Sequence, residues 1–344
     1  MTYKNILIVK LSAIGDVIHA LPVAHALKQT YPEARITWVV EKPAYDLLTN
    51  NPDIDEIIIF DKPKFKSLTG LLSNGYTFSK LLKSHKFDLA IDLQGLFKSA
   101  VISYLSGAPK RLVYCNAREL SDKIGQRICG NHEHGHVVDR YLDVAQHLGC
   151  KIDQVQFPMN ITEVEARKAE AIANHAGLQL ENPYVVLAPG TNWPTKCWPI
   201  THFAKLADKL YDDNIIPVII GGPNDNRLAR EIIENTKIPP IDITGKTSMK
   251  QLAYIIKRSM TFVGGDTGPM HLASAVCAPV VAMFGPTDPA RNGPYGKKHI
   301  VLTAPISCKG CWKRTCPKGQ RCLDTIDADT VYKAVESVIN KTSI

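Results

Sequence analysis

The segment from Phe262 to Gly285, FVGGDTGPMHLASAVCAPVVAMFG, constrains the fold of this chain more than any other. It reads as a short buried strand, a glycine turn, a helix and a second buried strand, which is the pattern of a βαβ unit in a parallel sheet. The run Asp266–Pro269 suits a helix start, because Asp or Thr can act as N-cap and Pro fits the first turn. We expect this helix start, with its unpaired N–H groups and His271, to bind a phosphate. An ordinary, well-capped turn fits the segment equally well.

Short apolar runs alternate with amphipathic stretches along the whole chain, so the βαβ pattern is not confined to one segment. The 344 residues are long for one domain and suit two. Because the alternation breaks at residues 149–158, we expect two doubly wound α/β domains, joined near residues 150–165, with a ligand between them. The expected strands are 6–9, 36–40, 56–60, 89–92, 111–113, 184–188, 215–220, 240–243, 261–263 and 280–284, and the expected helices are 16–29, 68–83, 98–105, 137–148, 163–176, 202–211 and 328–339.

Composition and charge exclude several classes of protein. Hydrophobic residues make up 45% and charged residues 22% of the chain, as in ordinary globular domains. No apolar run reaches about 18 residues, and the apolar start lacks a signal-peptide cleavage site, so we expect a cytoplasmic protein. The formal net charge of +8 favours an acidic ligand or an anionic membrane surface. Nucleic acid is not an expected partner, because no nucleic-acid-binding motif is present.

Four of the nine cysteines, Cys308, Cys311, Cys316 and Cys322, form a C-x2-C-x4-C-x5-C cluster. Thiols at such a spacing could hold a structural zinc ion or an iron–sulfur cluster. The spacing does not match a recognised zinc pattern with certainty, and a loop with free thiols or a facultative disulfide is the favoured interpretation. The other five cysteines are scattered, as in a reducing compartment. We therefore expect no metal in the chemistry.

The turn after the first expected strand, Lys10 to Val17, takes the place in the first half that Gly264–Gly268 takes in the second. It contains Gly15 alone, not G-x-G-x-x-G, so the standard dinucleotide fingerprint is missing. Asp16 in this turn is either the cap of its helix or a general base that faces the interdomain crevice and takes a proton from an acceptor hydroxyl.

A second loop directed at phosphate follows the expected strand 184–188 and reads PGTNWPTKCWP. Gly190 and Thr191 can bring main-chain and hydroxyl donors near a phosphate, and Lys196 is a point charge suited to a diphosphate oxygen. Together with the helix start at Asp266, this loop makes the phosphate prediction more specific than either turn alone.

Two further features have both a structural and a functional interpretation. Asp225 closes the next strand, where it can cap a helix or reach a ribose hydroxyl. Lys62, Lys64 and Lys66 form a basic loop after the third strand, which is either a solvated connection or a group that attracts an acidic acceptor.

Several segments carry a family resemblance when they are taken together: LIVKLSAIGDVIHALP, AIDLQGLFKSA, PGTNWPTKCWP, GGDTGPMHLASAV and FGPTDP. They resemble glycosyltransferase family 9, the lipopolysaccharide heptosyltransferases, over nearly the whole chain. Residues 92–99 and 116–119 are nearer to heptosyltransferase I than to heptosyltransferase II. The resemblance implies a GT-B fold, in which two Rossmann-like domains face each other across a cleft. Residues 1–160 would bind the acceptor and residues 161–325 the nucleotide sugar, while a helix within 326–344 would pack back toward the first domain.

The resemblance also implies an inverting transfer of L-glycero-D-manno-heptose from ADP-heptose to a Kdo residue of the lipopolysaccharide inner core, without a metal cofactor. The acceptor would be Kdo-lipid A, and the protein would be peripheral at the inner membrane. Asp16 matches the proposed general base. The expected donor-binding residues are Gly190, Thr191, Lys196, Asp225, Asp266, Thr267, Gly268 and His271, and the expected acceptor-binding residues are Gly15, Lys62, Lys64, Lys98 and Arg118.

Two departures from the family pattern leave alternatives open. The cysteine cluster is absent from the best-known heptosyltransferase I proteins, and Asp225 stands where those have Glu. A family member that uses another nucleotide sugar or another glycan acceptor therefore fits too. A nucleotide-sugar epimerase shares the two-domain architecture and is the alternative from another class, whereas a silent nucleotide-binding module and an oxidoreductase fit less well.

Overall fold

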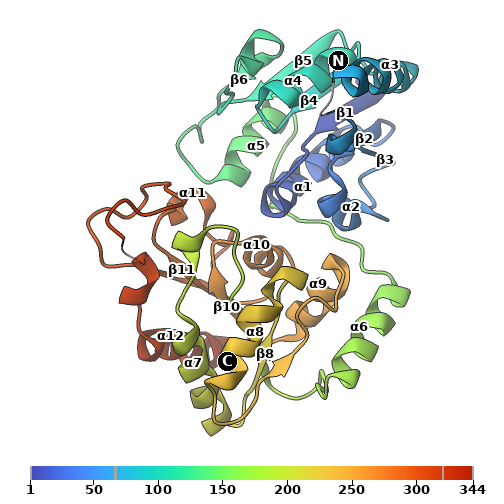
Figure 1. Cartoon of the computed structure of the whole chain (residues 1–344). Helices are drawn as coiled ribbons and strands as arrows, with labels where there is room; N and C mark the ends of the chain where they lie inside the picture. Colours follow the sequence, from blue (N-terminus) through green and yellow to red (C-terminus); the bar gives the residue numbers. More distant parts are fainter. Residues whose placement is uncertain (1, 66–67, 320, 343–344) are drawn as a thin grey trace. The chain divides into compact units, whose positions relative to one another are not determined.

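The computed structural model describes residues 2–65, 68–319 and 321–342 (Figure 1). Contacts between residues divide the chain into two compact units, Met1–Asn160 and Ile161–Ile344. Every strand expected from the sequence is present to within two residues at each end, and every expected helix to within three. Within the described residues, no helix has both the length and the apolar character that a membrane span requires.

The first unit is built on a six-stranded parallel sheet with the order β3-β2-β1-β4-β5-β6. Its core lies between this sheet and the covering helices, since the central strands β1, β2 and β4 are buried and α1 packs against α5 while α3 packs against α4. Its elements in chain order are β1 (Asn5–Val9), α1 (Ile14–Thr30), β2 (Arg35–Val40), α2 (Lys42–Leu48), β3 (Glu56–Ile59), η1 (Lys62–Phe65), α3 (Leu68–Ser84), β4 (Leu89–Asp92), α4 (Phe97–Leu105), β5 (Lys110–Tyr114), η2 (Ser121–Lys123), β6 (Gln126–Ile128) and α5 (Val137–His147).

The second unit contains another six-stranded parallel sheet, with the order β12-β11-β10-β7-β8-β9. Its elements are α6 (Glu163–His175), β7 (Tyr184–Ala188), η3 (Pro194–Lys196), α7 (Ile200–Asp212), β8 (Ile216–Ile219), η4 (Pro223–Asp225), α8 (Asn226–Glu234), β9 (Ile241–Asp242), α9 (Met249–Arg258), β10 (Thr261–Gly265), α10 (Gly268–Ala275), β11 (Val280–Phe284), α11 (Pro289–Asn292), β12 (His299–Thr303), η5 (Cys322–Thr325) and α12 (Ala328–Thr342).

The last helix, α12, packs within the second unit. Val331, Val335 and Val338 on its buried stripe belong to the same apolar core as Leu187 of β7 and Phe203 of α7. The helix contacts α7 and strands β10, β11 and β12. The apolar stripe of α12 is therefore covered by the second sheet, and the expectation that a helix within 326–344 packs back toward the first domain stays a prediction.

The two sheets have the same topology when the strands of each are numbered from its own first strand. Both then read 3-2-1-4-5-6, the order of doubly wound dinucleotide-binding folds. The order reverses between β1 and β4 in the first unit and between β7 and β10 in the second. Ligands of such sheets bind outside the carboxyl ends of the strands at this switch point. The loops after these four strands are therefore the places to look for a site.

Candidate functional site

The second switch point brings Lys196, Asp266 and His271 together. Lys196 Nζ lies 2.6 Å from Asp266 Oδ2 and 3.3 Å from the main-chain oxygen of Asp266. His271 Nε2 lies 3.2 Å from Asp266 Oδ1. Lys196 ends η3 in the loop after β7, Asp266 follows β10, and His271 lies in α10. Two loops and one helix thus converge on a single carboxylate, and we call these three residues the donor cluster.

Charge keeps Asp266 ionised despite its burial. Its side chain is only 6% exposed. Burial alone would raise the pKa of Asp266, but the hydrogen bond and charge of His271, together with the Lys196 ammonium, outweigh it and hold the pKa well below its usual range. The negative charge of Asp266 is therefore present at neutral pH, and it offsets the charge of Lys196.

The start of α10 follows the sequence prediction in its backbone. Thr267 is the N-cap and Pro269 stands in the first turn, but neither Asp266 nor Thr267 caps the helix through its side chain. Asp266 binds the cations instead, and Thr267 Oγ1 donates a hydrogen bond of 3.4 Å to the Gly265 oxygen. Thr267 and Gly268 are half-buried. The first N–H groups of α10 lack intrahelical partners, as at any helix start, and they lie next to the donor cluster.

Glycine is required where the neighbouring loops approach the two strand ends. A Cβ on Gly265 would lie 2.9 Å from the Lys196 oxygen. A Cβ on Gly190 would lie 2.3 Å from Asp225 Cγ. Asp225 is the N-cap residue of α8, but its carboxylate accepts from Gly222 N at 2.8 Å and makes no cap bond to that helix. The structure therefore places the predicted donor residues Gly190 and Asp225 in contact.

The loop after β7 also contains an aromatic residue to which the sequence analysis assigned no role. Trp193 N donates to Thr191 Oγ1 at 3.2 Å, so the predicted hydroxyl donor Thr191 is part of its own turn. Lys196 Nζ lies 4.5 Å from the centre of the Trp193 ring. Trp and Lys three residues apart in the loop sequence are the signal that could have indicated this contact.

Thr287 is a second residue that the sequence analysis did not assign. It follows β11 in the quoted FGPTDP motif and is 1% exposed. Its Oγ1 has no hydrogen-bond partner within the described part of the chain. A buried hydroxyl in this state can be satisfied by a ligand or by water.

In the first unit, Asp16 lies in the first turn of α1 and is half-buried. Its Oδ2 accepts from the main-chain N of Ala13 at 3.1 Å, and Ala13 rather than Asp16 is the N-cap. Gly15 is buried beside it. The structural interpretation of Asp16 is therefore partly right, since the carboxylate supports the helix start from the third helical position.

The DLQG segment after β4 fixes the loop that leads to Asp16. Gln94 Oε1 accepts from Leu11 N at 3.1 Å and from Ser12 N at 3.2 Å. The carboxylate of Asp92 accepts at 2.9 Å from Gln94 N, Gly95 N and Ser99 Oγ. Burial raises the pKa of Asp92 to about 6, and these hydrogen bonds only reduce the rise. Sequence reasoning missed Asp92 and Gln94 as positioning residues, although it quoted their motif.

The other predicted acceptor residues are spread along the first sheet. Lys98 lies at the start of α4 and pairs with Glu41 at 2.7 Å. Lys64 pairs with Asp61 at 3.3 Å, and both side chains are largely exposed. Lys62 is exposed in η1, which follows strand β3.

Arg118 is exposed after β5, and its main-chain N donates to the Gly95 oxygen at 2.8 Å. Lys66 of the basic loop lies outside the described residues. The basic loop and Arg118 follow strands that are separated by β2, β1 and β4 in the sheet order, so the structure does not gather these cations into one cluster.

All nine cysteines are free thiols. In the clustered set, Cys322 is buried, Cys308 and Cys316 are partly buried, and Cys311 is exposed. Burial raises the pKa of the Cys322 thiol, and the other three thiols raise it further. Among residues 2–65, 68–319 and 321–342, no three His, Cys, Asp or Glu side chains are arranged to hold a metal ion.

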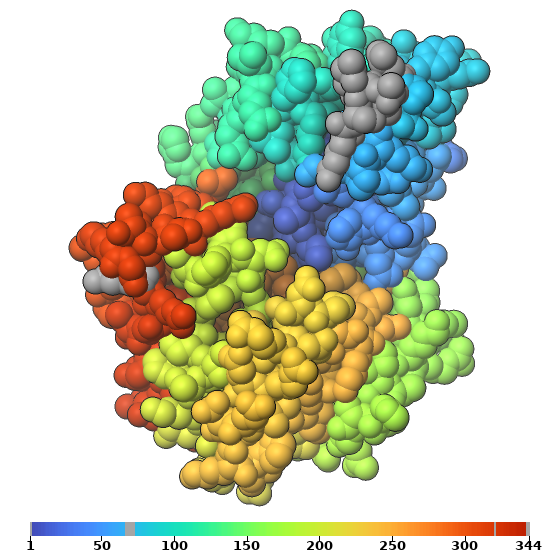
Figure 2. Space-filling view, in the orientation of Figure 1, coloured from blue at the N-terminus to red at the C-terminus, as the bar shows by residue number. Residues whose placement is uncertain are grey.

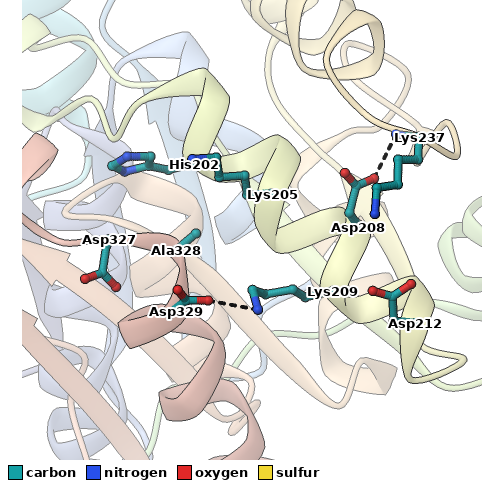
Figure 3. Close-up of a pocket in the computed structure, with 9 residues that line it drawn as sticks. All are labelled: His202, Lys205, Asp208, Lys209, Asp212, Lys237, Asp327, Ala328 and Asp329. Atoms are coloured by element: carbon teal, nitrogen blue, oxygen red, sulfur yellow. Dashed lines mark hydrogen bonds and ion pairs between the residues drawn. The ribbon is translucent and has the colours of Figure 1, made fainter.

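A cavity of about 460 Å³ lies away from the donor cluster, along α7 and the start of α12 (Figure 3). Lysines and aspartates line it in nearly equal numbers, and they pair with each other. Lys209 Nζ lies 2.8 Å from Asp329 Oδ1, and Lys237 N donates to Asp208 Oδ1 at 2.8 Å. None of the predicted site residues lines this cavity. Its balanced charges do not suit a diphosphate.

Comparison with known proteins identifies the family. The profile of glycosyltransferase family 9 (heptosyltransferase) matches residues 76–321, well over half of the chain. Lipopolysaccharide heptosyltransferase 1 of Pseudomonas aeruginosa is 29% identical over 323 residues, which cover 91% of this chain and 87% of that protein. The crystal structure of a family 9 glycosyl transferase from Veillonella parvula is 26% identical and superposes with a TM-score of 0.88 over 99% of this chain and 98% of that one.

An Escherichia coli heptosyltransferase has been solved with ADP and with ADP-2-deoxy-2-fluoro heptose. It is 25% identical, with TM-scores of 0.76 and 0.75, and the match covers 97% of this chain and 99% of that one. The two parallel six-stranded sheets agree with the GT-B fold of these enzymes. The extent of the family match and the shared fold lead to one conclusion: this chain is a glycosyltransferase and belongs to glycosyltransferase family 9.

Proposed function

We propose that this enzyme transfers L-glycero-D-manno-heptose from ADP-heptose to a Kdo residue of the lipopolysaccharide inner core, with inversion at the anomeric carbon. The main observation in favour of a nucleotide-sugar donor is the cluster of Lys196, Asp266 and His271 at the switch point of the second sheet. The relative solved with ADP and with a fluorinated ADP-heptose supports the choice of donor. The lipopolysaccharide heptosyltransferase from P. aeruginosa supports the choice of acceptor class.

The donor cluster would stabilise the leaving ADP. Negative charge develops on the β-phosphate as the bond to the sugar breaks. Lys196 and His271 can donate hydrogen bonds to that charge, and so can Thr191 and the first amides of α10 at Thr267 and Gly268. These donors are held in place before the reaction, so little reorganisation opposes the transfer. We propose that the reaction needs no divalent metal, and activity should persist in the presence of a chelator.

Asp16 would act as the general base on the acceptor. It would accept the proton of the acceptor hydroxyl while the oxygen attacks the anomeric carbon. The hydrogen bond from Ala13 N to Asp16 Oδ2 orients the carboxylate, and Gln94 in turn fixes the preceding loop. The second carboxylate oxygen would receive the proton.

The remaining predicted residues divide between the two substrates. Asp225, against Gly190, would bind a ribose hydroxyl of the adenosine. Lys62, Lys64, Lys98 and Arg118, together with Gly15, would bind the acidic acceptor. Since that acceptor is a lipid, we propose that the enzyme works in the cytoplasm, peripherally bound to the inner membrane.

Product analysis by mass tests the proposal. The full-length protein is incubated with Kdo-lipid A and either ADP-heptose or a UDP-sugar, and the products are weighed. We expect Kdo-lipid A to gain one heptose from ADP-heptose alone. Transfer from a UDP-sugar only, or hydrolysis or epimerisation of the donor without an acceptor, would overturn the proposal.

A further inference from the structure

The loop from Cys308 to Cys316 is anchored beside the donor cluster, although it is far from that cluster in sequence. Gly310 N and Trp312 N donate to the main-chain oxygens of Gly285 and Pro286, at 2.9 and 2.7 Å, just beyond β11. The buried Thr195 Oγ1 donates to the Lys313 oxygen at 2.9 Å. In Figure 2 the red end of the chain lies against the yellow-green segment that contains the loop after β7. We call residues 308–316 the anchored loop.

The donor residues predicted from the sequence do not by themselves provide a positive site. Lys196 is paired with the ionised Asp266, and a further carboxyl group, that of Asp225, lies against Gly190 in the loop that contains Lys196. A nucleoside diphosphate is a multiply charged anion, which binds best where the local charge is positive. Additional cations are therefore needed at this edge of the sheet, and the anchored loop contains Lys309, Lys313 and Arg314 with no acidic residue.

Arg314 is the cation of the anchored loop that reaches the donor loop. Its Cζ lies 5.1 Å from the centre of the Trp193 ring, and Lys196 Nζ lies 4.5 Å from the same ring centre. Arg314 is exposed, and within the described residues its guanidinium forms no ion pair with a carboxylate. Stacking on Trp193 orients the guanidinium without neutralising its charge. Its planar set of donors remains available, and this geometry matches phosphate oxygens.

We propose that Arg314 is a further donor-binding residue, which contacts the diphosphate of the nucleotide sugar and supplies the positive charge that the Lys196–Asp266 pair lacks. The inference rests on the proposed function, since it concerns the same donor site. It assigns a role to the anchored loop that does not depend on metal binding by its cysteines. It also explains why two cations lie close to the Trp193 ring.

Isothermal titration of the full-length protein with ADP and with adenosine tests this role. Arg314→Gln should weaken ADP binding about tenfold, the effect of one charge-assisted hydrogen bond at a partly exposed site. Adenosine binding should change by less than about twofold, because the lost contact is to phosphate. Arg314→Lys should give an intermediate ADP affinity, since it keeps the charge but not the planar donors.

Lys309→Gln is the matched control, because it removes one charge from the same loop at an exposed residue that, within the described part of the chain, makes no cation–π contact with Trp193. It should bind ADP within about twofold of the wild type. The role of Arg314 is refuted if Arg314→Gln binds ADP as tightly as Lys309→Gln, or if it loses adenosine and ADP affinity equally, as a merely structural change would. If the wild-type protein itself does not bind ADP, the proposed function fails first, and the role of Arg314 fails with it.

Discussion

Asp92 and Asp266 occupy corresponding places in the two units, since each stands at the carboxyl end of the fourth strand of its sheet. Both are buried. Asp92 is held mainly by neutral donors, two main-chain N–H groups and the Ser99 hydroxyl, so burial prevails and raises its pKa to about 6. Burial acts on Asp266 in the same direction, but the charges of His271 and Lys196 prevail and lower its pKa. One topology thus supports two opposite electrostatic environments.

The contrast shows where function resides in this fold. Both sheets have the same strand order, so the difference comes from the loops that follow the strands. In the first unit, Asp92 and Gln94 use their hydrogen bonds to fix backbone around the turn that contains Asp16. In the second unit, Asp266 pairs with the side chains of Lys196 and His271. Under the proposed function, the first switch point would position one reactive carboxylate, that of Asp16, whereas the second would bind the charged diphosphate.

The strongest test of this contrast is Asp16→Asn in the first unit. The amide oxygen can still accept from Ala13 N, so α1 keeps its start, but the group can no longer take a proton. We expect kcat to fall by about 10²–10⁴-fold, the usual contribution of a general base, with an unchanged Kd for ADP. Steady-state kinetics and titration with ADP measure the two effects.

Asp16→Ala separates chemistry from structure at the same position. It should lose turnover to the same extent as Asp16→Asn, and in addition lower the free energy of unfolding by about 1 kcal/mol, because the contact to Ala13 N is gone. If Asp16→Asn keeps wild-type turnover, the carboxylate serves only the start of α1.

The pH dependence of stability tests the comparison of the two aspartates. The pKa of Asp92 is raised from 3.8 to about 6, so its stabilising contribution is complete below pH 4 and is lost as pH rises through 6. This pKa shift corresponds to a change of about 3 kcal/mol in the free energy of unfolding. Asp92→Asn should remove this loss, so the stability difference between wild type and variant should change by about that amount between pH 4 and pH 7. Chemical denaturation at each pH measures it.

Asp266→Asn should show the opposite sign. The folded-state pKa of Asp266 is lowered, so its contribution is present above the ordinary carboxyl pKa and is lost as pH falls below it. At neutral pH the free energy of unfolding should be higher for the wild type than for Asp266→Asn, and lower for the wild type than for Asp92→Asn. Both differences should become smaller as the pH falls, so they change in opposite directions. Parallel profiles for the two variants would contradict the electrostatic contrast between the units.

Lys196→Met is expected to raise the Kd for ADP by about tenfold or more, because it removes a charged group that donates hydrogen bonds to phosphate. It also leaves Asp266 buried with one cation fewer, so the melting temperature should fall. The double variant Lys196→Met/Asp266→Asn should recover stability without recovering ADP binding, because no unpaired charge remains. Asp92→Asn is the matched control, with unchanged ADP affinity. Recovery of ADP binding in the double variant would show that Lys196 only neutralises Asp266.

Sequence reasoning found the donor cluster because parallel strands place their following loops at one edge of a sheet. Lys196 and Asp266 are 70 residues apart, yet each follows a recognisable buried strand. Their mutual pairing was not predictable, because a local pattern makes Asp266 a helix cap and carries no information on a contact across that separation. The contact between Arg314 and Trp193 was not predictable for the same reason, since Arg314 lies in a loop with no periodic pattern.

The two strands that sequence reasoning missed, β6 and β12, have weak patterns for physical reasons. Strand β6 is three residues long and mostly exposed, so it shows no continuous apolar run. Strand β12 lies at the edge of its sheet, is only partly buried and has an apolar run of just Ile300 to Leu302. The stripe of Val331, Val335 and Val338 identifies α12 as amphipathic. It does not identify which core covers the helix, and the structure places this stripe in the core of the second unit.

Gly190→Ala gives the smallest expected effect and tests how closely the second switch point is packed. The new Cβ would lie 2.3 Å from Asp225 Cγ, so the carboxylate has to move away from its place. If Asp225 binds the ribose, the donor KM should rise about fivefold to tenfold with little change in kcat, since the loss is in binding. Gly75→Ala is the control, because no atom lies within 4 Å of a Cβ there. In an Asp225→Ala background the obstruction is gone, so Gly190→Ala should add almost nothing further. A full additional effect in that background would mean that Gly190 is needed for its backbone and that Asp225 has no part in donor binding.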